Sequence, residues 1–165
     1  MFTQMPYNNL RYSPRPTLTE EQQQSLNCGS FSTEMEGEIS PESLPHQNFL
    51  FITDDCNNDV GFLFFVEHST DEYEIELGLF DPKNAESGFI EFCFSKMNEA
   101  LSYCDLQPTT LSAVVRQENE YKEKVISQLL KYGFKTIIND NPSMDLILNH
   151  LKHAGTSVFE KRFSS

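Results

Sequence analysis

The chain has 165 residues, of which 38% are hydrophobic, and its 25 Asp and Glu residues against 12 Lys and Arg give a formal net charge of −13. This length is enough for one domain with a substantial core and short for two of ordinary size, so we expect a single domain over residues 1–165. With no basic patch to offset the negative charge, the composition argues against nucleic acid and anionic membrane surfaces as partners. An acidic surface suits cationic partners such as amines or basic peptides, although solubility alone also explains it.

The four cysteines, Cys28, Cys56, Cys93 and Cys104, form no CxxC pair. Because the last two fall in or beside an expected helix, we interpret them as reduced, packed thiols and expect a cytoplasmic protein. The chain starts without a secretory hydrophobic segment, and export by a system that reads other signals stays open. A composition rich in Phe, Asn and Ser suits a bacterial protein.

The first part of the chain is mostly polar. Leu10 to Tyr12 indicate a short strand, and capping boxes that begin at Thr17 or Thr19 predict a helix ending near Leu26. Residues 27–47 combine Ser, Gly, Pro and Glu without a repeating apolar face, which is typical of an acidic loop.

Three strands follow. The runs Phe49 to Asp55 and Val60 to His68 are β-branched and aromatic and are separated by the turn-forming residues CNND, which predicts a hairpin. Tyr73 to Phe80 first alternates polar with apolar residues and then becomes apolar, as expected of a strand that enters the centre of a sheet.

The second half begins as helix, strand, helix. Apolar residues recur at helical spacing from Ile90 to about Tyr103, and Thr109 to Val115 is a strand. The run EYKEKVISQLLKYGF predicts another amphipathic helix that ends at Gly133.

The C-terminal part is predicted to hold two strands and a tail. KTIIND and SMDLILNHL form the strands, and residues 152–165 form the tail. This order of elements predicts an α/β (α+β) fold with a mixed, mostly antiparallel central sheet flanked by helices.

Two stretches together resemble the GNAT superfamily, the acyl-CoA-dependent N-acyltransferases. YEIELGLFDPKNAESGF is similar to the central strand, phosphate loop and helix start of that family, and QENEYKEKVISQLLKYGFKTI to its last helix. The resemblance implies a GNAT-like sheet and acetyl-CoA as the acyl donor. It also implies direct transfer of an acetyl group to an amine of a small molecule or protein.

In the family, the phosphate loop carries Arg or Gln, then two residues, Gly, one residue, and Gly or Ala. Gly88 keeps the central glycine, whereas Ala85 and Ile90 stand at the other two positions, and Glu86 adds a negative charge. By the resemblance, the pyrophosphate would be held by backbone amides at the helix start. The amides concerned are those of Ser87, Gly88, Phe89 and Ile90.

The strand before this loop provides the candidate base. By the resemblance, Glu74 stands where some family members place the glutamate that accepts the amine proton, and Glu76 follows on the same face. The alternative is that both carboxylates belong to a solvated face of the strand. The resemblance also implies that Gly78, Leu79 and Phe80 offer backbone groups to the pantetheine arm of the cofactor.

The general acid is less clear from the sequence. Many family members have a tyrosine four residues before the Gly-Phe that ends the last helix, and here Leu129 takes that position. Tyr132 and Tyr121 are the alternatives, with packing as the other explanation for Tyr132. Asn119 corresponds to an asparagine that opens this helix in relatives, or it caps the helix.

The departures at Ala85, Glu86, Ile90 and Leu129 leave a second function open. In that alternative the chain is a catalytically inactive binding or regulatory module with a GNAT fold. A homodimer is an open alternative in either case.

Overall fold

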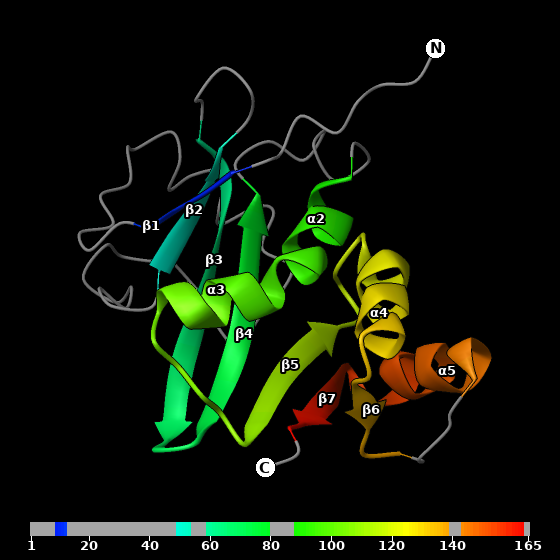
Figure 1. The fold of residues 1–165 in the computed structure, drawn as a ribbon. Coiled ribbons are helices and arrows are strands. Elements are labelled where there is room, and N and C mark those ends of the chain that lie inside the picture. The colour runs from blue at the N-terminus through cyan, green and yellow to red at the C-terminus, as the bar shows by residue number, and fades with distance from the viewer. Residues whose placement is uncertain (1–8, 13–48, 54–58, 80–87, 139–142, 164–165) are drawn as a thin grey trace.

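The computed structural model describes residues 9–12, 49–53, 59–79, 88–138 and 143–163. The expected helix near Leu26, the acidic loop 27–47, Phe80 and Ser87 lie outside these ranges. The described elements, shown in Figure 1, are the strands β1 (Asn9–Tyr12), β2 (Phe49–Thr53), β3 (Asp59–Ser69), β4 (Glu72–Leu79), β5 (Thr110–Arg116), β6 (Lys135–Thr136) and β7 (Thr156–Arg162), and the helices α2 (Phe89–Ser95), α3 (Met97–Tyr103), α4 (Lys122–Lys131) and α5 (Met144–Ala154).

The strands form one mixed sheet in the order β1-β2-β3-β4-β5-β7-β6. Its neighbouring strands are antiparallel except for the parallel pair β4–β5. The predicted hairpin is present as β2 and β3, and β1 pairs with β2 at the edge. The prediction of a mostly antiparallel sheet flanked by helices is therefore confirmed.

The main apolar cluster lies on one face of the sheet, and a smaller set of buried apolar side chains, among them Phe62 and Phe64, lies on the other. On β4 the odd-numbered residues belong to the main cluster, and they pack with apolar side chains from all four described helices. Figure 1 shows α3 crossing in front of β3 and β4, α2 beside the upper part of β4, and α4 and α5 beside β5 and β6. The even-numbered residues of β4 consequently point to the opposite face. These residues include Glu74, Glu76 and Gly78.

The helix expected from Ile90 to Tyr103 is two helices that meet at Lys96. The Ser95 hydroxyl donates a hydrogen bond of 2.7 Å to the carbonyl oxygen of Phe92. The Lys96 amide is shared between the carbonyls of Phe92 and Cys93, at 3.1 and 3.2 Å. A serine that bonds back to the preceding turn competes with the helical ladder and bends the helix, which accounts for the break.

The segment SMDLILNHL is a helix, so its prediction as a strand was wrong. Ser143 caps α5, because its Oγ accepts a hydrogen bond of 3.2 Å from the amide of Leu146. Ile147 and Leu151, four residues apart, are fully buried, and Gly155 ends the helix in the left-handed region at φ 82°. The short apolar run LIL is typical of a strand and conceals this four-residue spacing.

The predicted tail at 152–165 is also corrected, because β7 runs through it. This strand pairs with β5 along its whole length and lies between β5 and β6. Ser157 and Phe159 are buried, while Glu160 and Lys161 are only partly covered. The partly exposed Glu160 and Lys161 interrupt the apolar pattern of the strand. Its pairing with β5 joins segments that are far apart in the sequence, so no local signal predicts it.

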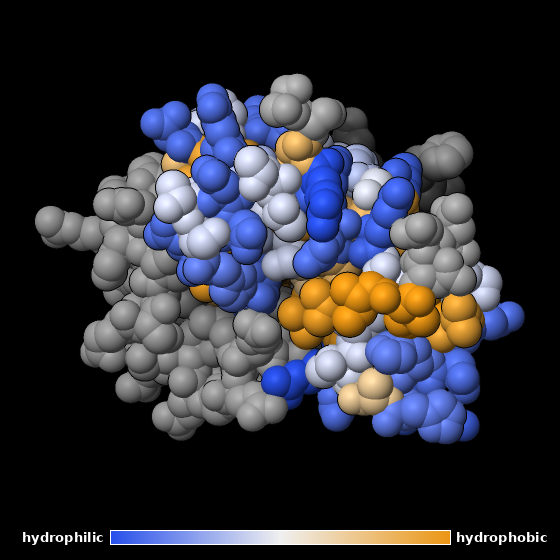
Figure 2. All heavy atoms as spheres, turned by 90° about the horizontal axis from the view of Figure 1, so that it is seen from below, coloured by the Kyte–Doolittle hydropathy of each residue, from blue (hydrophilic) through white to orange (hydrophobic). Residues whose placement is uncertain are grey.

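None of the described helices is long and apolar enough to cross a membrane. Viewed from the β6–β7 end, the surface is largely polar but carries one band of apolar residues (Figure 2). Ile137, just after β6, is 69% exposed.

Candidate active site

Strands β4 and β5 part near their N-terminal ends. Their ladder consists of three parallel pairs, of which the last joins Glu74 to Ser112. Both strands continue well beyond it, β4 to Leu79 and β5 to Arg116. Figure 1 shows them diverging from this point. Beyond Glu74, β4 therefore keeps its pairing with β3 but has no ladder partner on the side of β5, and we call this divergence of the two strands the opening.

Two carboxylates lie on β4 at this opening. Glu74 and Glu76 are each only 2% exposed. The alternative interpretation, a solvated face of the strand, is therefore wrong for both residues. Glutamate is almost never buried without a partner, because loss of water disfavours its charge.

The partner of Glu74 is His68. The ring Nε2 of His68 lies 3.0 Å from Oε1 of Glu74, and the two side chains are 44% and 3% exposed. When Nε2 carries the hydrogen, it donates to the carboxylate. The pair thus connects a buried carboxylate to a ring that reaches the solvent.

His68 owes its place to an irregularity in the hairpin. The β3–β4 register shifts between Glu67 and Ser69, so His68 is the extra residue of a bulge. Bulges redirect side chains and are common beside functional sites. Nothing in the sequence marks His68 for this role, because its approach to Glu74, six residues later, depends on the hairpin register.

The glycines of the hairpin let aromatic rings pack directly on the backbone. A Cβ added to Gly78 would lie 2.0 Å from the ring of Phe62, which is its partner across the ladder. A Cβ on Gly61 would meet the ring of Phe89 at 2.4 Å and the carbonyl oxygen of Gly78 at 2.4 Å. Gly78 therefore has a packing role. The expected contact of its backbone with the pantetheine arm stays a prediction, as does the same contact for Leu79.

Gly88 immediately precedes α2 with φ 94°, a conformation that favours glycine. The side chains of Phe89 and Ile90 are fully buried in the core. The Ile90 side chain therefore points into the protein and away from the start of the helix. What this junction can offer a ligand is backbone N–H groups.

The first turns of α2 and α4 are joined by an ion pair. Lys124 Nζ lies 3.5 Å from Glu91 Oε1, and the side chains are 36% and 35% exposed. At that exposure the pair contributes little to stability. It does show that the starts of these two helices are neighbours. Each helix follows one of the two diverging strands, α2 after β4 and α4 after β5.

The candidates on and before α4 have structural partners. Oδ1 of Asn119 accepts a hydrogen bond of 2.8 Å from the amide of Tyr121, which is itself the N-cap of α4 and has no side-chain cap. Asn119 therefore shapes the turn before the helix and is not its cap. The ring of Tyr132 stacks on Phe94 with centroids 6.1 Å apart, and Leu129 is fully buried. The catalytic role of Tyr132 stays a prediction.

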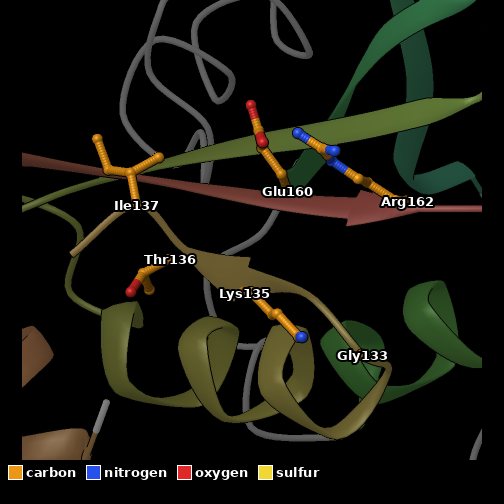
Figure 3. A pocket seen from close by; sticks show the side chains of 6 residues that line it. All are labelled: Gly133, Lys135, Thr136, Ile137, Glu160 and Arg162. Atoms are coloured by element: carbon orange, nitrogen blue, oxygen red, sulfur yellow. The ribbon is translucent and has the colours of Figure 1, made fainter. Parts of the chain in front are cut away.

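A hollow of about 430 Å³ lies beside β6 and β7 (Figure 3). Figure 3 shows Glu160, Arg162 and Ile137 on the same side of the strands. Glu160 pairs with Ser112, the neighbour of Glu74, so this hollow shares the face of the sheet that carries the two carboxylates. Its charges are mixed, since Lys135 also lines it.

The described thiols are not activated. Burial raises the pKa of Cys93 well above its usual range, and the Glu91 carboxylate adds to the effect. Partial burial raises the pKa of Cys104 to about 11. Both cysteines are free. Among the described residues, no group of three His, Cys, Asp or Glu side chains is arranged to hold a metal ion.

No protein-family model matches the sequence, and no curated protein matches it. Solved structures do match. A GNAT superfamily phosphinothricin acetyltransferase from Sinorhizobium meliloti, solved in complex with AcCoA, superposes with a TM-score of 0.64 at 14% identity. The match covers 97% of this chain and 90% of that one.

Two further structures agree. Ard1 from Thermoplasma volcanium gives a TM-score of 0.54 at 16% identity, covering 95% of this chain and 98% of that one. N-acetylglutamate synthase from Neisseria gonorrhoeae, complexed with coenzyme A and N-acetyl-glutamate, gives 0.56 at 14% identity, covering 95% of this chain and 35% of that one. The chain has the GNAT fold, and the resemblance found in its sequence is confirmed at the level of the fold.

Proposed function

We propose that the chain is an acyl-CoA-dependent N-acyltransferase that moves an acetyl group from acetyl-CoA to an amine by direct attack. The observation that carries this proposal is the buried Glu74, held by His68 at 3.0 Å where β4 and β5 part. A buried carboxylate at an opening is a good candidate for a general base. The GNAT fold supports the reaction class.

In this proposal Glu74 accepts the proton of the attacking amine, and Glu76, on the same face, assists it. Acetyl-CoA supplies the thioester that is attacked. The backbone from Gly78 to Phe80 binds the pantetheine arm along the opening. The pyrophosphate is assigned to the amides of Ser87, Gly88, Phe89 and Ile90, an assignment that the burial of the last two side chains favours.

Tyr132 is the proposed proton donor to the departing thiolate. Its stacking on Phe94 already accounts for the position of its ring. Tyr132→Phe keeps that contact and removes only the hydroxyl, so it separates packing from catalysis. Asn119 is retained as a residue that shapes the cofactor side of α4 through its hydrogen bond to Tyr121.

The acceptor that we propose is an amine-bearing small molecule or protein, with a cationic one favoured by the net charge of −13. We propose that the protein acts in the cytoplasm of a bacterium. A homodimer is the oligomeric state to test first, by sedimentation, with the apolar band of Figure 2 as the candidate contact.

The proposal is tested by calorimetric titration with acetyl-CoA, with a short pantetheine analogue that lacks the phosphates as control. We expect micromolar binding that depends on the phosphates, and release of CoA thiol when primary amines are added. Absence of binding at millimolar acetyl-CoA would contradict the proposal.

A second candidate function is a binding or regulatory module that does not catalyse. It is favoured by Leu129, which is fully buried where many family members have the tyrosine. This alternative predicts no affinity for CoA. Thiol release from acetyl-CoA by the purified protein would exclude it.

A further inference from the structure

We propose that His68 is a positioning residue for acetyl transfer, which acts by holding the carboxylate of Glu74 through its ring Nε2. This inference rests on the proposed function, because it concerns the orientation of the general base. His68 does not touch the substrate in this role.

The two oxygens of Glu74 have different surroundings. Oε1 lies 3.0 Å from His68 Nε2. Oε2 is buried and has no hydrogen-bond partner among the residues that the structure describes. Since an unpartnered buried oxygen is costly, the arrangement is that expected if His68 fixes one oxygen and leaves the other to accept a proton.

The backbone geometry supports these different roles of the two Glu74 oxygens. His68 sits at the register shift between Glu67 and Ser69, near the closed end of the hairpin, while Glu74 forms the last β4–β5 pair. The bulge therefore brings a half-exposed imidazole to the one carboxylate that stands at the point of separation. An ordinary surface histidine would need no such placement.

The other charged groups on this face do not replace His68. The carboxylates of Glu72 and Glu76 lie on β4 itself. Glu160 of β7 pairs with Ser112 of β5, which in turn pairs with Glu74, so β5 separates Glu160 from Glu74. The cations of the described strands on this face are Arg116, at the C-terminal end of β5, and Lys135 and Arg162, on β6 and β7 beyond β5. Among the described side chains, His68 is the hydrogen-bond donor that lies within reach of the Glu74 carboxylate.

The reaction step is then as follows. The amine nitrogen forms a bond to the acetyl carbon, and its proton passes to Oε2 of Glu74. The bond between that carbon and the sulfur breaks, and the sulfur leaves with the electron pair as a thiolate. His68 stays hydrogen-bonded to Oε1 throughout, so its contribution is to the orientation of the accepting oxygen.

The test is a double-mutant cycle with His68→Leu and Glu74→Gln. Release of CoA thiol from acetyl-CoA is measured with a lysine-containing peptide, a polyamine and free amino acids as acceptors. We expect His68→Leu to lower kcat about 10- to 100-fold, as for loss of a hydrogen bond to a charged group, with the KM for acetyl-CoA unchanged. In the Glu74→Gln background, the same substitution should have no further effect.

Two other variants sharpen the result. His68→Gln keeps an N–H donor and should retain kcat to within about threefold. His153→Leu, at an exposed histidine of α5, is the matched control and should leave kcat unchanged. If His68→Leu does not fold, His68→Asn replaces it, because it stays polar but is too short to reach Oε1.

The outcomes separate the two proposals. If Glu74→Gln is inactive and His68→Leu keeps the kcat of the wild type, the His68 inference is overturned and the proposed function stands. Losses that add in the double variant would also overturn it, since they indicate a purely structural role. If the wild type releases no thiol with any of these acceptors, or Glu74→Gln keeps full activity, the proposed base fails and the His68 inference fails with it.

Discussion

The Glu74 end of β4 and the Gly88 junction before α2 use the chain in opposite ways. At Glu74 a charged side chain is buried and held by an imidazole 3.0 Å away. At Gly88 the neighbouring side chains, Phe89 and Ile90, are fully buried in the core, and the glycine adopts φ 94°. Side chains carry the candidate chemistry in the first region, and only the backbone faces outward in the second.

Under the proposed function, the two regions differ in how freely their side chains can vary. Backbone N–H groups need no particular side chain, so Ile90 can stand where the family has Gly or Ala, provided that it points inward. A general base depends on its carboxylate, which no backbone group replaces. Substitutions should therefore affect turnover at Glu74 and conformation or binding at Gly88.

The largest effect is expected for Glu74→Gln. This change keeps the shape of the side chain and removes its ability to accept a proton, so acetyl transfer should fall about 100- to 10,000-fold. Calorimetry should show unchanged affinity for acetyl-CoA. Full turnover in a variant that folds normally would remove Glu74 from the mechanism.

Gly78→Val tests the packing between the two regions. Its Cβ would lie 2.0 Å from the Phe62 ring, so overpacking should lower the free energy of unfolding by about 3 kcal/mol. Urea denaturation measures this loss, and Phe62→Leu in the same chain should recover part of it. An unchanged unfolding midpoint for Gly78→Val would mean that Phe62 does not cover Gly78 in solution.

Gly88→Ala and Gly155→Ala form a matched pair at positive φ, 94° and 82°. Each should cost about 1–2 kcal/mol of stability, because a side chain is strained in this region. Only Gly88→Ala should also weaken acetyl-CoA binding, roughly tenfold, as for loss of one well-placed hydrogen bond. Equal affinities in the two variants would show that the Gly88 junction holds no cofactor.

The smallest effect is expected for chemical labelling of the two described thiols, Cys93 and Cys104. Iodoacetamide should leave Cys93 unlabelled in the folded protein, because burial and Glu91 raise its pKa and the thiolate is the reactive form. Cys104, with a pKa of about 11, should label slowly and only above neutral pH. Peptide mass spectrometry before and after unfolding provides the comparison. Rapid labelling of Cys93 would mean that the buried side of α2 opens readily.

Much of the fold could be predicted from the sequence because its signals are local. The sequence CNND, which favours a turn, predicts the hairpin of β2 and β3, and apolar spacing reveals α4. The final segment was mispredicted for two different reasons. The run LIL obscures the local four-residue spacing of Ile147 and Leu151 in α5, whereas β7 depends on its pairing with the distant β5. The break at Lys96 arises from a hydrogen bond of the Ser95 side chain, which the apolar period does not register.

For the candidate site, the residues that could carry the chemistry were predictable from the sequence: two glutamates two positions apart on a central strand, and a glycine before a helix. The burial of Glu74 and Glu76, the inward direction of Ile90 and the contact of His68 with Glu74 follow from the three-dimensional packing. Burial and side-chain pairing across a hairpin depend on register and on packing between distant segments. No local pattern in one sequence fixes those quantities.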